Sequence, residues 1–274
     1  MRIDLHTHSR VSDGTQSPSE LVEAAIEVGL DVLGLTDHDT AGGWAEADRA
    51  AEGTSLTVEH GIEISTRHHG HGVHLLAYRP DPTYPPLAEA LDRVLDGRSS
   101  RVPAILERLR AHGMEVTAAD VRQAAQGTAA TGRPHVADAM VTLGYVADRS
   151  QAFREWLNPG MPAYVDRYAA SLLEMLRLVG EAGGVTVIAH PWGRHGPEAM
   201  GEAAIAELKG LGLAGLEVDH EDHPPEVREQ LRAIARRLDL VVTGSSDHHG
   251  AGKDGHDLGC NTTAPEEYER LLGR

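Results

Sequence analysis

Residues 2–8 read RIDLHTH, in which charged and apolar residues alternate before two histidines. Residues 17–20, SPSE, then supply a helix N-cap, a proline at the first helical position and a capping-box glutamate. The pattern predicts a strand over residues 2–6, a helix that stops at Gly29, and a second strand over residues 31–36. Strand, helix and strand in this order form the repeating unit of α/β proteins.

Further strands are expected around a parallel sheet, with helices between most of them. They cover residues 56–58, 61–64, 73–78, 185–189, 213–218 and 240–243. Four prolines between residues 80 and 86 interrupt this pattern, and from residue 87 to about residue 162 only helical patterns follow. We therefore predict a first α/β part over residues 1–80, a helical insertion over residues 81–163 and a second α/β part over residues 164–274.

The composition excludes several classes of function. The chain has 274 residues, 41% of them hydrophobic, which is enough for a sizeable core. Its net charge of −17 disfavours binding to duplex DNA. No run approaches the roughly 18 apolar residues of a membrane span, and no signal-peptide pattern is present, so we expect a cytoplasmic protein. The 17 histidines suggest that bound metal cations supply positive charge for a phosphate-bearing substrate.

Polar residues cluster where the predicted strands end. The segments are residues 4–8 (DLHTH), 36–39 (TDHD), 188–191 (IAHP), 217–220 (EVDH) and 245–249 (SSDHH). In parallel α/β barrels the carboxyl ends of the strands meet on one face, where active sites lie. The five segments therefore predict a single site.

Spacing and environment point to metal ligands within this site. His6 and His8 are two residues apart, so on a strand both face the same side, roughly 7 Å apart, close enough to share an ion. Glu63 lies in an apolar strand, where an ionised carboxylate is costly unless it coordinates a metal or forms a buried salt bridge. His74, eleven residues later, is interpreted as a ligand, the alternative being a core histidine.

Together these motifs resemble the PHP (polymerase and histidinol phosphatase) superfamily of metal-dependent phosphoesterases. Within it, the sequence is most similar to the bacterial branch of nucleoside 3′,5′-bisphosphate phosphatases and 5′ to 3′ RNA exonucleases. That branch carries a helical insertion with Gly-Arg-Pro-His, which here is residues 132–135. The resemblance implies a distorted (βα)7 TIM-like barrel in which the insertion caps the substrate. One departure is His248, where many relatives have an aromatic residue.

The resemblance also implies three divalent metal ions. Mixed imidazole and carboxylate ligands favour Mn, Fe or Zn at these positions. One ion would take His6, His8 and Asp247, a second Asp13, His38 and His249, and a third His74 and His190, with Glu63 bridging. The catalytic residues would be Asp13, His38, Glu63, Asp247 and His249, and the substrate-binding residues Arg133, His135 and Arg194. A surface salt bridge is the alternative role for Arg133.

The function expected is hydrolysis of phosphate monoesters of small nucleotides by metal-activated hydroxide. Nucleoside 3′,5′-bisphosphates, AMP and short 5′-phosphorylated oligonucleotides, including RNA 5′ ends, all fit. A short substrate is favoured because no basic strip with interleaved aromatic residues marks a long single-strand path. The alternatives are an amidohydrolase-like hydrolase of non-phosphate substrates and a non-catalytic metal-binding module.

Overall fold

The computed structural model describes residues 1–193 and 196–273 and contains a sheet that closes almost into a barrel. The strands follow one another in the order β1 (Ile3–Thr7), β2 (Val32–Leu35), β3 (Thr57–His68), β4 (His71–Tyr78), β6 (Val185–Ile188), β7 (Gly215–Asp219) and β8 (Val241–Gly244). A short strand, β5 (Ala170–Ser171), pairs with β3. The segment after β8 returns to β1, where His8 N donates a hydrogen bond to His248 O at 2.8 Å. The predicted distorted barrel is confirmed.

The sheet is only partly parallel, which corrects the expectation of a parallel sheet. Strand β4 is antiparallel to both β3 and β6, whereas the other neighbours in the barrel path are parallel. Residues 57–68 also form one long strand rather than the two short ones expected. Strands β3 and β4 are antiparallel because a tight hairpin joins them between His68 and His71. Its two loop residues, His69 and Gly70, have positive φ angles of 47° and 84°. Such two-residue turns join antiparallel strands directly, without a crossover helix.

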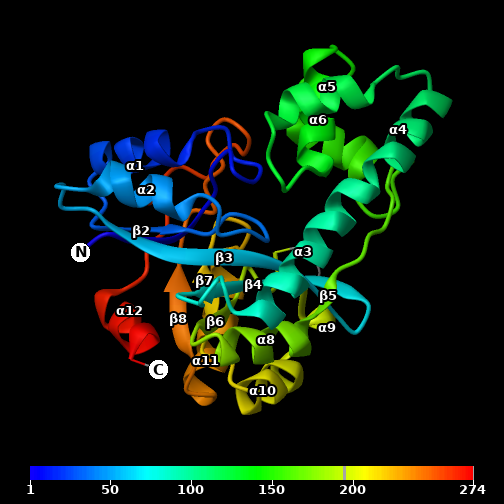
Figure 1. The fold of residues 1–274 in the computed structure, drawn as a ribbon. Coiled ribbons are helices and arrows are strands. Elements are labelled where there is room, and N and C mark those ends of the chain that lie inside the picture. Colours follow the sequence, from blue (N-terminus) through cyan, green and yellow to red (C-terminus); the bar gives the residue numbers. More distant parts are fainter. Residues whose placement is uncertain (194–195, 274) are drawn as a thin grey trace.

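Helices cover the outside of the sheet (Figure 1). They are α1 (Pro18–Glu27), α2 (Trp44–Ala51), α8 (Leu172–Glu181), α9 (Gly196–Ala199), α10 (Glu202–Gly210), α11 (Pro225–Arg237) and α12 (Pro265–Leu272). Helix α1 begins with the predicted capping box of Ser17 and Glu20. It buries Leu21 and Val22 completely, and each such side chain contributes about 1.5–3 kcal/mol relative to exposure. Among the described residues, no helix is long and apolar enough to cross a membrane.

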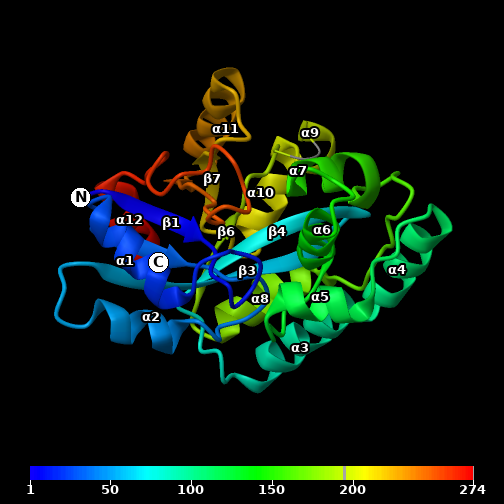
Figure 2. The same cartoon turned by 90° about the horizontal axis from the view of Figure 1, so that it is seen from above.

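The segment between β4 and β5 is helical and extends from the barrel (Figures 1 and 2). It contains α3 (Pro85–Ser100), α4 (Val102–Ala111), α5 (Ala118–Ala125), α6 (Arg133–Thr142), α7 (Arg149–Ala152) and the π-helical turn η1 (Phe153–Leu157). Helix α3 packs into the barrel core through Leu87 and Val94. From Val102 onward the helices have a hydrophobic core of their own, which includes Ile105 and Met140. This second core holds the helices together beside the open end of the barrel.

Candidate metal centre

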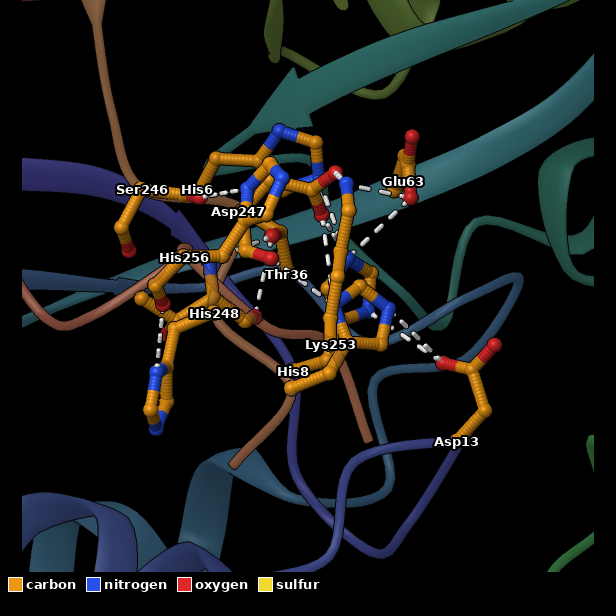
Figure 3. A network of polar contacts seen from close by, with 12 residues as sticks. His6, His8, Asp13, Thr36, Glu63, Ser246, Asp247, His248, Lys253 and His256 are labelled. Atoms are coloured by element: carbon orange, nitrogen blue, oxygen red, sulfur yellow. Dashed lines mark hydrogen bonds and ion pairs between the residues drawn. The ribbon is translucent and has the colours of Figure 1, made fainter. Parts of the chain in front are cut away.

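Side chains from six strands or strand ends meet at one end of the barrel. Figure 3 shows part of this group, including His6, His8 and Glu63. Three overlapping groups each bring potential ligand atoms within 4.8 Å of one another. The groups are His6, His8, Glu63 and Asp247; His8, Asp13, His38 and His249; and His38, Glu63 and His74. His190 joins them, since its Nε2 lies 3.1 Å from Glu63 Oε1. The structure thus brings together all nine residues expected to bind metal.

Glu63 is the centre of this arrangement. Its Oε2 lies 3.3 Å from His6 Nε2, 3.2 Å from His8 Nε2 and 3.1 Å from His38 Nδ1. Its Oε1 lies 2.6 Å from His74 Nδ1. Burial alone would raise the pKa of Glu63, but the surrounding histidines, His74 foremost, lower the pKa well below its usual value. Glu63 is therefore an ionised carboxylate with both oxygens directed at imidazoles, as a bridging ligand requires.

Asp13 faces a second set of imidazoles from a tight turn. Its Oδ1 lies 3.4 Å from His249 Nε2, and its Oδ2 lies 3.7 Å from His38 Nε2. Gly14 permits this turn, because a Cβ atom there would lie 2.4 Å from the main-chain oxygen of His8. Asp37 orders the preceding loop by accepting hydrogen bonds from Ser9 N at 2.8 Å and Ser12 Oγ at 2.6 Å. The loop sequence is thus adapted to hold Asp13 over the barrel end.

Left-handed backbone conformations occur where the strands enter the site. Asp39, His190 and Asp247 have φ angles of 59°, 28° and 53°, a region that residues other than glycine seldom adopt. Such conformations persist only where the surrounding structure enforces them, and they cluster at functional sites.

The Oδ1 atom of Asp247 is buried without a hydrogen-bond partner, although it lies 3.4 Å from His6 Nε2 and 3.3 Å from His8 Nε2. A buried carboxylate oxygen among imidazole nitrogens fits a metal cation better than a protein partner.

Glu217, in the middle of β7, orients the first histidine of the site. Its Oε1 lies 2.9 Å from His6 Nδ1, and its Oε2 accepts a hydrogen bond from His190 N at 2.7 Å. Burial opposes ionisation of Glu217, but the charge of His6 outweighs it and lowers the pKa of Glu217 to about 2. The carboxylate therefore fixes the proton on Nδ1 of His6 and leaves Nε2 directed at Glu63, as is usual behind metal-ligating histidines. Asp4 has a main-chain role, because it accepts hydrogen bonds from Ser246 N and Gly259 N.

Three residues that the sequence did not single out as ligands surround Asp247 Oδ2. Lys253 Nζ lies 2.6 Å away, and His220 Nε2 lies 3.3 Å away. Asp222 N donates to His220 Nδ1, so the proton of a neutral His220 is on Nε2 and is directed at Asp247. His256 joins the same cluster and has its Nδ1 atom 2.6 Å from Ser246 O. These contacts hold the carboxylate in place, and only the folded loops reveal them.

His248 points away from this centre. Its Nδ1 lies 2.8 Å from His256 O and its Nε2 lies 3.0 Å from Gln16 Oε1, on the side of Asp247 remote from Glu63 (Figure 3). The residue that departs from the family pattern therefore packs between loops.

Two of the three residues expected to bind the substrate, Arg133 and His135, lie in the insertion. Arg133 Nη1 donates to Leu157 O at 2.9 Å, and its guanidinium lies over the rings of Phe153 and Tyr164, with centroids at 5.4 Å and 5.7 Å. His135 is buried and accepts a hydrogen bond from Gly132 N through Nδ1. Arg194 lies outside the described residues.

Comparison with known proteins agrees with this site. Residues 4–126 match the model of the PHP domain. A 3′,5′-nucleoside bisphosphate phosphatase from Chromobacterium violaceum is 34% identical over 270 residues, which cover 96% of this chain and 92% of the relative. The chain belongs to the PHP domain family.

Other PHP proteins are similar along nearly the whole chain. A 5′-3′ exoribonuclease from Haemophilus influenzae is 32% identical over 248 residues, which cover 90% of each protein. A solved structure from Bifidobacterium adolescentis, provisionally named a metal-dependent phosphoesterase, superposes with a TM-score of 0.93 at 36% identity and covers 99% of this chain and 95% of that protein. The predicted family, fold and class of enzyme, a metal-dependent phosphoesterase, are confirmed.

Proposed function

We propose that the protein hydrolyses phosphate monoesters of small nucleotides, with nucleoside 3′,5′-bisphosphates, AMP and short 5′-phosphorylated oligonucleotides as candidate substrates. The observation that supports it best is the buried Glu63 carboxylate, both of whose oxygens face imidazole nitrogens. Relatives named for a bisphosphate phosphatase and a 5′-3′ exoribonuclease support the substrate class.

Three divalent cations, of Mn, Fe or Zn, are proposed as the cofactors. His6, His8 and Asp247 would hold the first, Asp13, His38 and His249 the second, and His74 and His190 the third, with Glu63 shared between them. The donor set fits, because it combines imidazoles with ionised carboxylates and includes the unpartnered Oδ1 atom of Asp247. When bound, such cations lower the pKa of water and neutralise phosphate oxygens.

The protein residues have the task of holding this centre and its substrate. Asp13 Oδ1 and His249 Nε2 lie 3.4 Å apart, and Arg149 of the insertion bonds to the main-chain oxygen of Asp13. We therefore assign Asp13 and His249 to the face on which the phosphate binds. Glu217 and His220 fix the orientations of His6 and Asp247. Arg133 is assigned to the substrate-binding side, since its planar guanidinium can donate two parallel hydrogen bonds to a phosphate. We propose that His135 and Arg194 assist it.

The experiment that tests this function is a substrate panel with Mn²⁺ added to metal-stripped protein. Adenosine 3′,5′-bisphosphate, AMP, a phosphodiester and a 5′-phosphorylated RNA oligomer are compared by phosphate release and product analysis. A carboxylic ester serves as the substrate of the amidohydrolase alternative. We expect phosphate release from the nucleotides that depends on metal, and hydrolysis of the carboxylic ester alone would refute the proposal.

Variants make the panel specific for the site. Asp13→Asn and His38→Gln each remove one proposed ligand and should abolish phosphate release. The control is His60→Gln, because His60 lies outside the centre, stacked on Trp44 and 2.9 Å from Asp48. Full turnover by the Asp13 variant would exclude the proposed metal arrangement.

A further inference from the structure

The hairpin that joins β3 to β4 carries three histidines in four residues, at positions 68, 69 and 71. It lies beside β5 (Figure 1). His68 and His71 are directly opposed partners in the antiparallel pair, on either side of the two-residue turn. Opposed residues of such a pair extend from the same face of the sheet, with Cβ atoms about 4.5–5.5 Å apart. The fold therefore brings two imidazoles together at the tip of the hairpin.

This histidine pair lies on the opposite side of the sheet from the metal centre. Side chains alternate along a strand, so His68 shares a face with Ile64 and not with Glu63. Ile64 belongs to the core beneath the outer helices. Leu76, the partner of Glu63, belongs instead to a separate core shared by β1, β4, β6 and β8. His68 and Glu63 are also five residues apart, which corresponds to roughly 16 Å along a strand. The pair is thus distinct from the metal centre.

His68 is buried in a way that leaves one ring nitrogen unsatisfied. The residue is only 5% exposed, and within the described ranges its Nε2 atom has no hydrogen-bond partner. Burial, followed by the charge of His69, lowers the pKa of His68, so the ring is neutral at physiological pH. Neutral imidazole is the form that binds metal ions. Buried polar atoms without partners are rare in folded proteins, and a bound ion is one of the few explanations for them.

The neighbours of His68 favour a cation over an anion. The charge of Glu207, in α10, opposes the effect of burial on the pKa of His68, so this carboxylate acts on the ring. The ring of His69 lies beside that of His68, with centroids 4.1 Å apart. The adjacent Arg67 extends from the other face of the strand and pairs with Asp166. Imidazole nitrogens near a carboxylate are the surroundings that transition-metal cations prefer.

We propose that His68 and His71 bind one divalent transition-metal cation of the Zn²⁺ type, with Glu207 contributing its negative charge to the site. Two imidazoles on opposed residues of a hairpin can both approach one ion at Zn–N distances of about 2.0–2.1 Å. Zn²⁺, Cu²⁺ and Ni²⁺ all accept imidazole ligands, whereas Mg²⁺ and Ca²⁺ prefer oxygen. The bound ion ties β3 to β4 at their turn, so its role is structural. The site does not depend on the proposed function.

The number of bound zinc ions tests the site in the whole, metal-stripped chain. Calorimetric titration with Zn²⁺ counts the ions in the unchanged protein, in His68→Gln and in His71→Gln. We expect each variant to bind one ion fewer, because a single imidazole does not hold the cation. The control is His60→Gln, since His60 lies on the same face of β3 but stacks on Trp44 and lies 2.9 Å from Asp48. Ions at the catalytic centre are common to all four proteins, so the difference counts the hairpin site alone.

Two further measurements separate the hairpin from the catalytic centre. Phosphate release with Mn²⁺ should change less than about twofold in His68→Gln and His71→Gln, because these residues lie on the other side of the sheet. Glu207→Gln should keep the number of zinc ions and weaken the affinity of the last one by about tenfold.

Two results would overturn the hairpin site. One is an equal number of zinc ions in His71→Gln, His60→Gln and the unchanged protein. The other is a joint loss of zinc and of phosphate release, which would assign these histidines to the catalytic centre. If the unchanged protein releases no phosphate from any nucleotide, the proposed function fails, and the zinc count still decides on the hairpin.

Thermal unfolding gives a second readout. An ion that binds only the folded hairpin stabilises the fold, so Zn²⁺ should raise the Tm of the unchanged protein and of His60→Gln more than that of His71→Gln. His71 is more exposed than His68, so His71→Gln keeps the test decisive if His68→Gln folds poorly. An equal rise in all three proteins would contradict the proposal and would leave a buried water as the partner of His68 Nε2.

Discussion

Arg149, in the first turn of α7, donates a hydrogen bond from Nη1 to the main-chain oxygen of Asp13 at 2.8 Å. Its other terminal nitrogen lies 2.6 Å from Asp138 Oδ2, in α6. The insertion therefore reaches across to the turn that places a proposed metal ligand, and the contact joins residues that are 136 positions apart in the sequence. The position of Asp13 depends on helices outside the barrel.

Arg149 contacts Asp13 through the main-chain oxygen and not through the side chain. Replacing Arg149 should nevertheless impair the reaction. Arg149→Met loses a hydrogen bond from a charged group, a contact that contributes about 1.5–3 kcal/mol, so we expect kcat to fall about tenfold or more. Asp138→Asn should have a smaller effect in the same direction. Arg154→Met is the control, because Arg154 is an exposed arginine in the adjacent η1. Unchanged kcat in Arg149→Met would show that the turn holds Asp13 by itself.

Glu63→Gln should remove metal as well as activity. An amide oxygen is neutral and an amide nitrogen cannot bind a cation, so the bridge between the histidine groups is lost. We expect a lower metal content by elemental analysis and a fall in phosphate release of about a hundredfold or more. The matched control is Glu59→Gln on the same strand, since Glu59 is equally buried but pairs with Arg79 instead. Equal metal content in the two variants would contradict a bridging role for Glu63.

Glu217 should affect metal affinity through His6. Glu217→Ala leaves His6 without the carboxylate that fixes its ring, and losses of about 10–100-fold in metal affinity are typical when such a partner is removed. A titration with Mn²⁺, followed by activity and by calorimetry, measures the loss. Restoration of affinity by Glu217→Gln, which can still accept a hydrogen bond from His6 Nδ1, would show that orientation rather than charge is responsible. Unaltered affinity in Glu217→Ala would exclude the positioning role.

The stability of the metal-free protein should fall as the pH rises above neutrality. Burial opposes protonation of His8, but the neighbouring carboxylates of Asp247 and Glu63 outweigh it and raise the pKa of His8 to about 9. Because this pKa exceeds the unfolded value of about 6.5, the proton stabilises the fold fully below about pH 6.5, and this stabilisation is lost as the pH rises through about 9. Thermal unfolding in the presence of a chelator should show a falling Tm across that range.

Bound metal should reverse this trend, because cations replace the protons that the histidines lose. Metal affinity should therefore rise between about pH 6.5 and 9, with protons released on binding. Parallel unfolding curves with Mn²⁺ and with chelator measure the difference in Tm, which we expect to widen as the pH rises. A constant difference would mean that protons and metal do not compete at this site.

Sequence patterns predicted much of the fold and of the metal centre, since strands and the polar residues that follow them can be recognised in short stretches of sequence. His6, His8 and His38 follow strands whose ends must meet, and Glu63 stands out as a charge in an apolar strand. The antiparallel position of β4 was not predicted, because the apolar pattern of residues 73–78 indicates a strand but not its direction in the sheet. Lys253 and His220 also escaped prediction. Their contacts with Asp247 arise only when the loops after β7 and β8 fold over the barrel end.

The burial of Arg98 and Arg101 shows the same limit. Arg98 and Arg101 lie in a stretch of ordinary helical composition, and nothing in their spacing distinguishes them from surface residues. Their burial depends on how α3 passes from the barrel core to the separate core of the insertion. The burial of these two arginines therefore follows from three-dimensional packing and not from composition.

The hairpin between β3 and β4 makes the chain length at this point critical. Glu63 pairs with Leu76 and Ser65 with His74, so Glu63 and His74 share one face of the two strands. Inserting or deleting one residue at His69 or Gly70 would move the register by one step and turn His74 to the opposite face of the sheet. We therefore expect natural variation to change the length of this hairpin by even numbers of residues. The sequence of the turn can then vary while His74 stays on the same face of the sheet as Glu63.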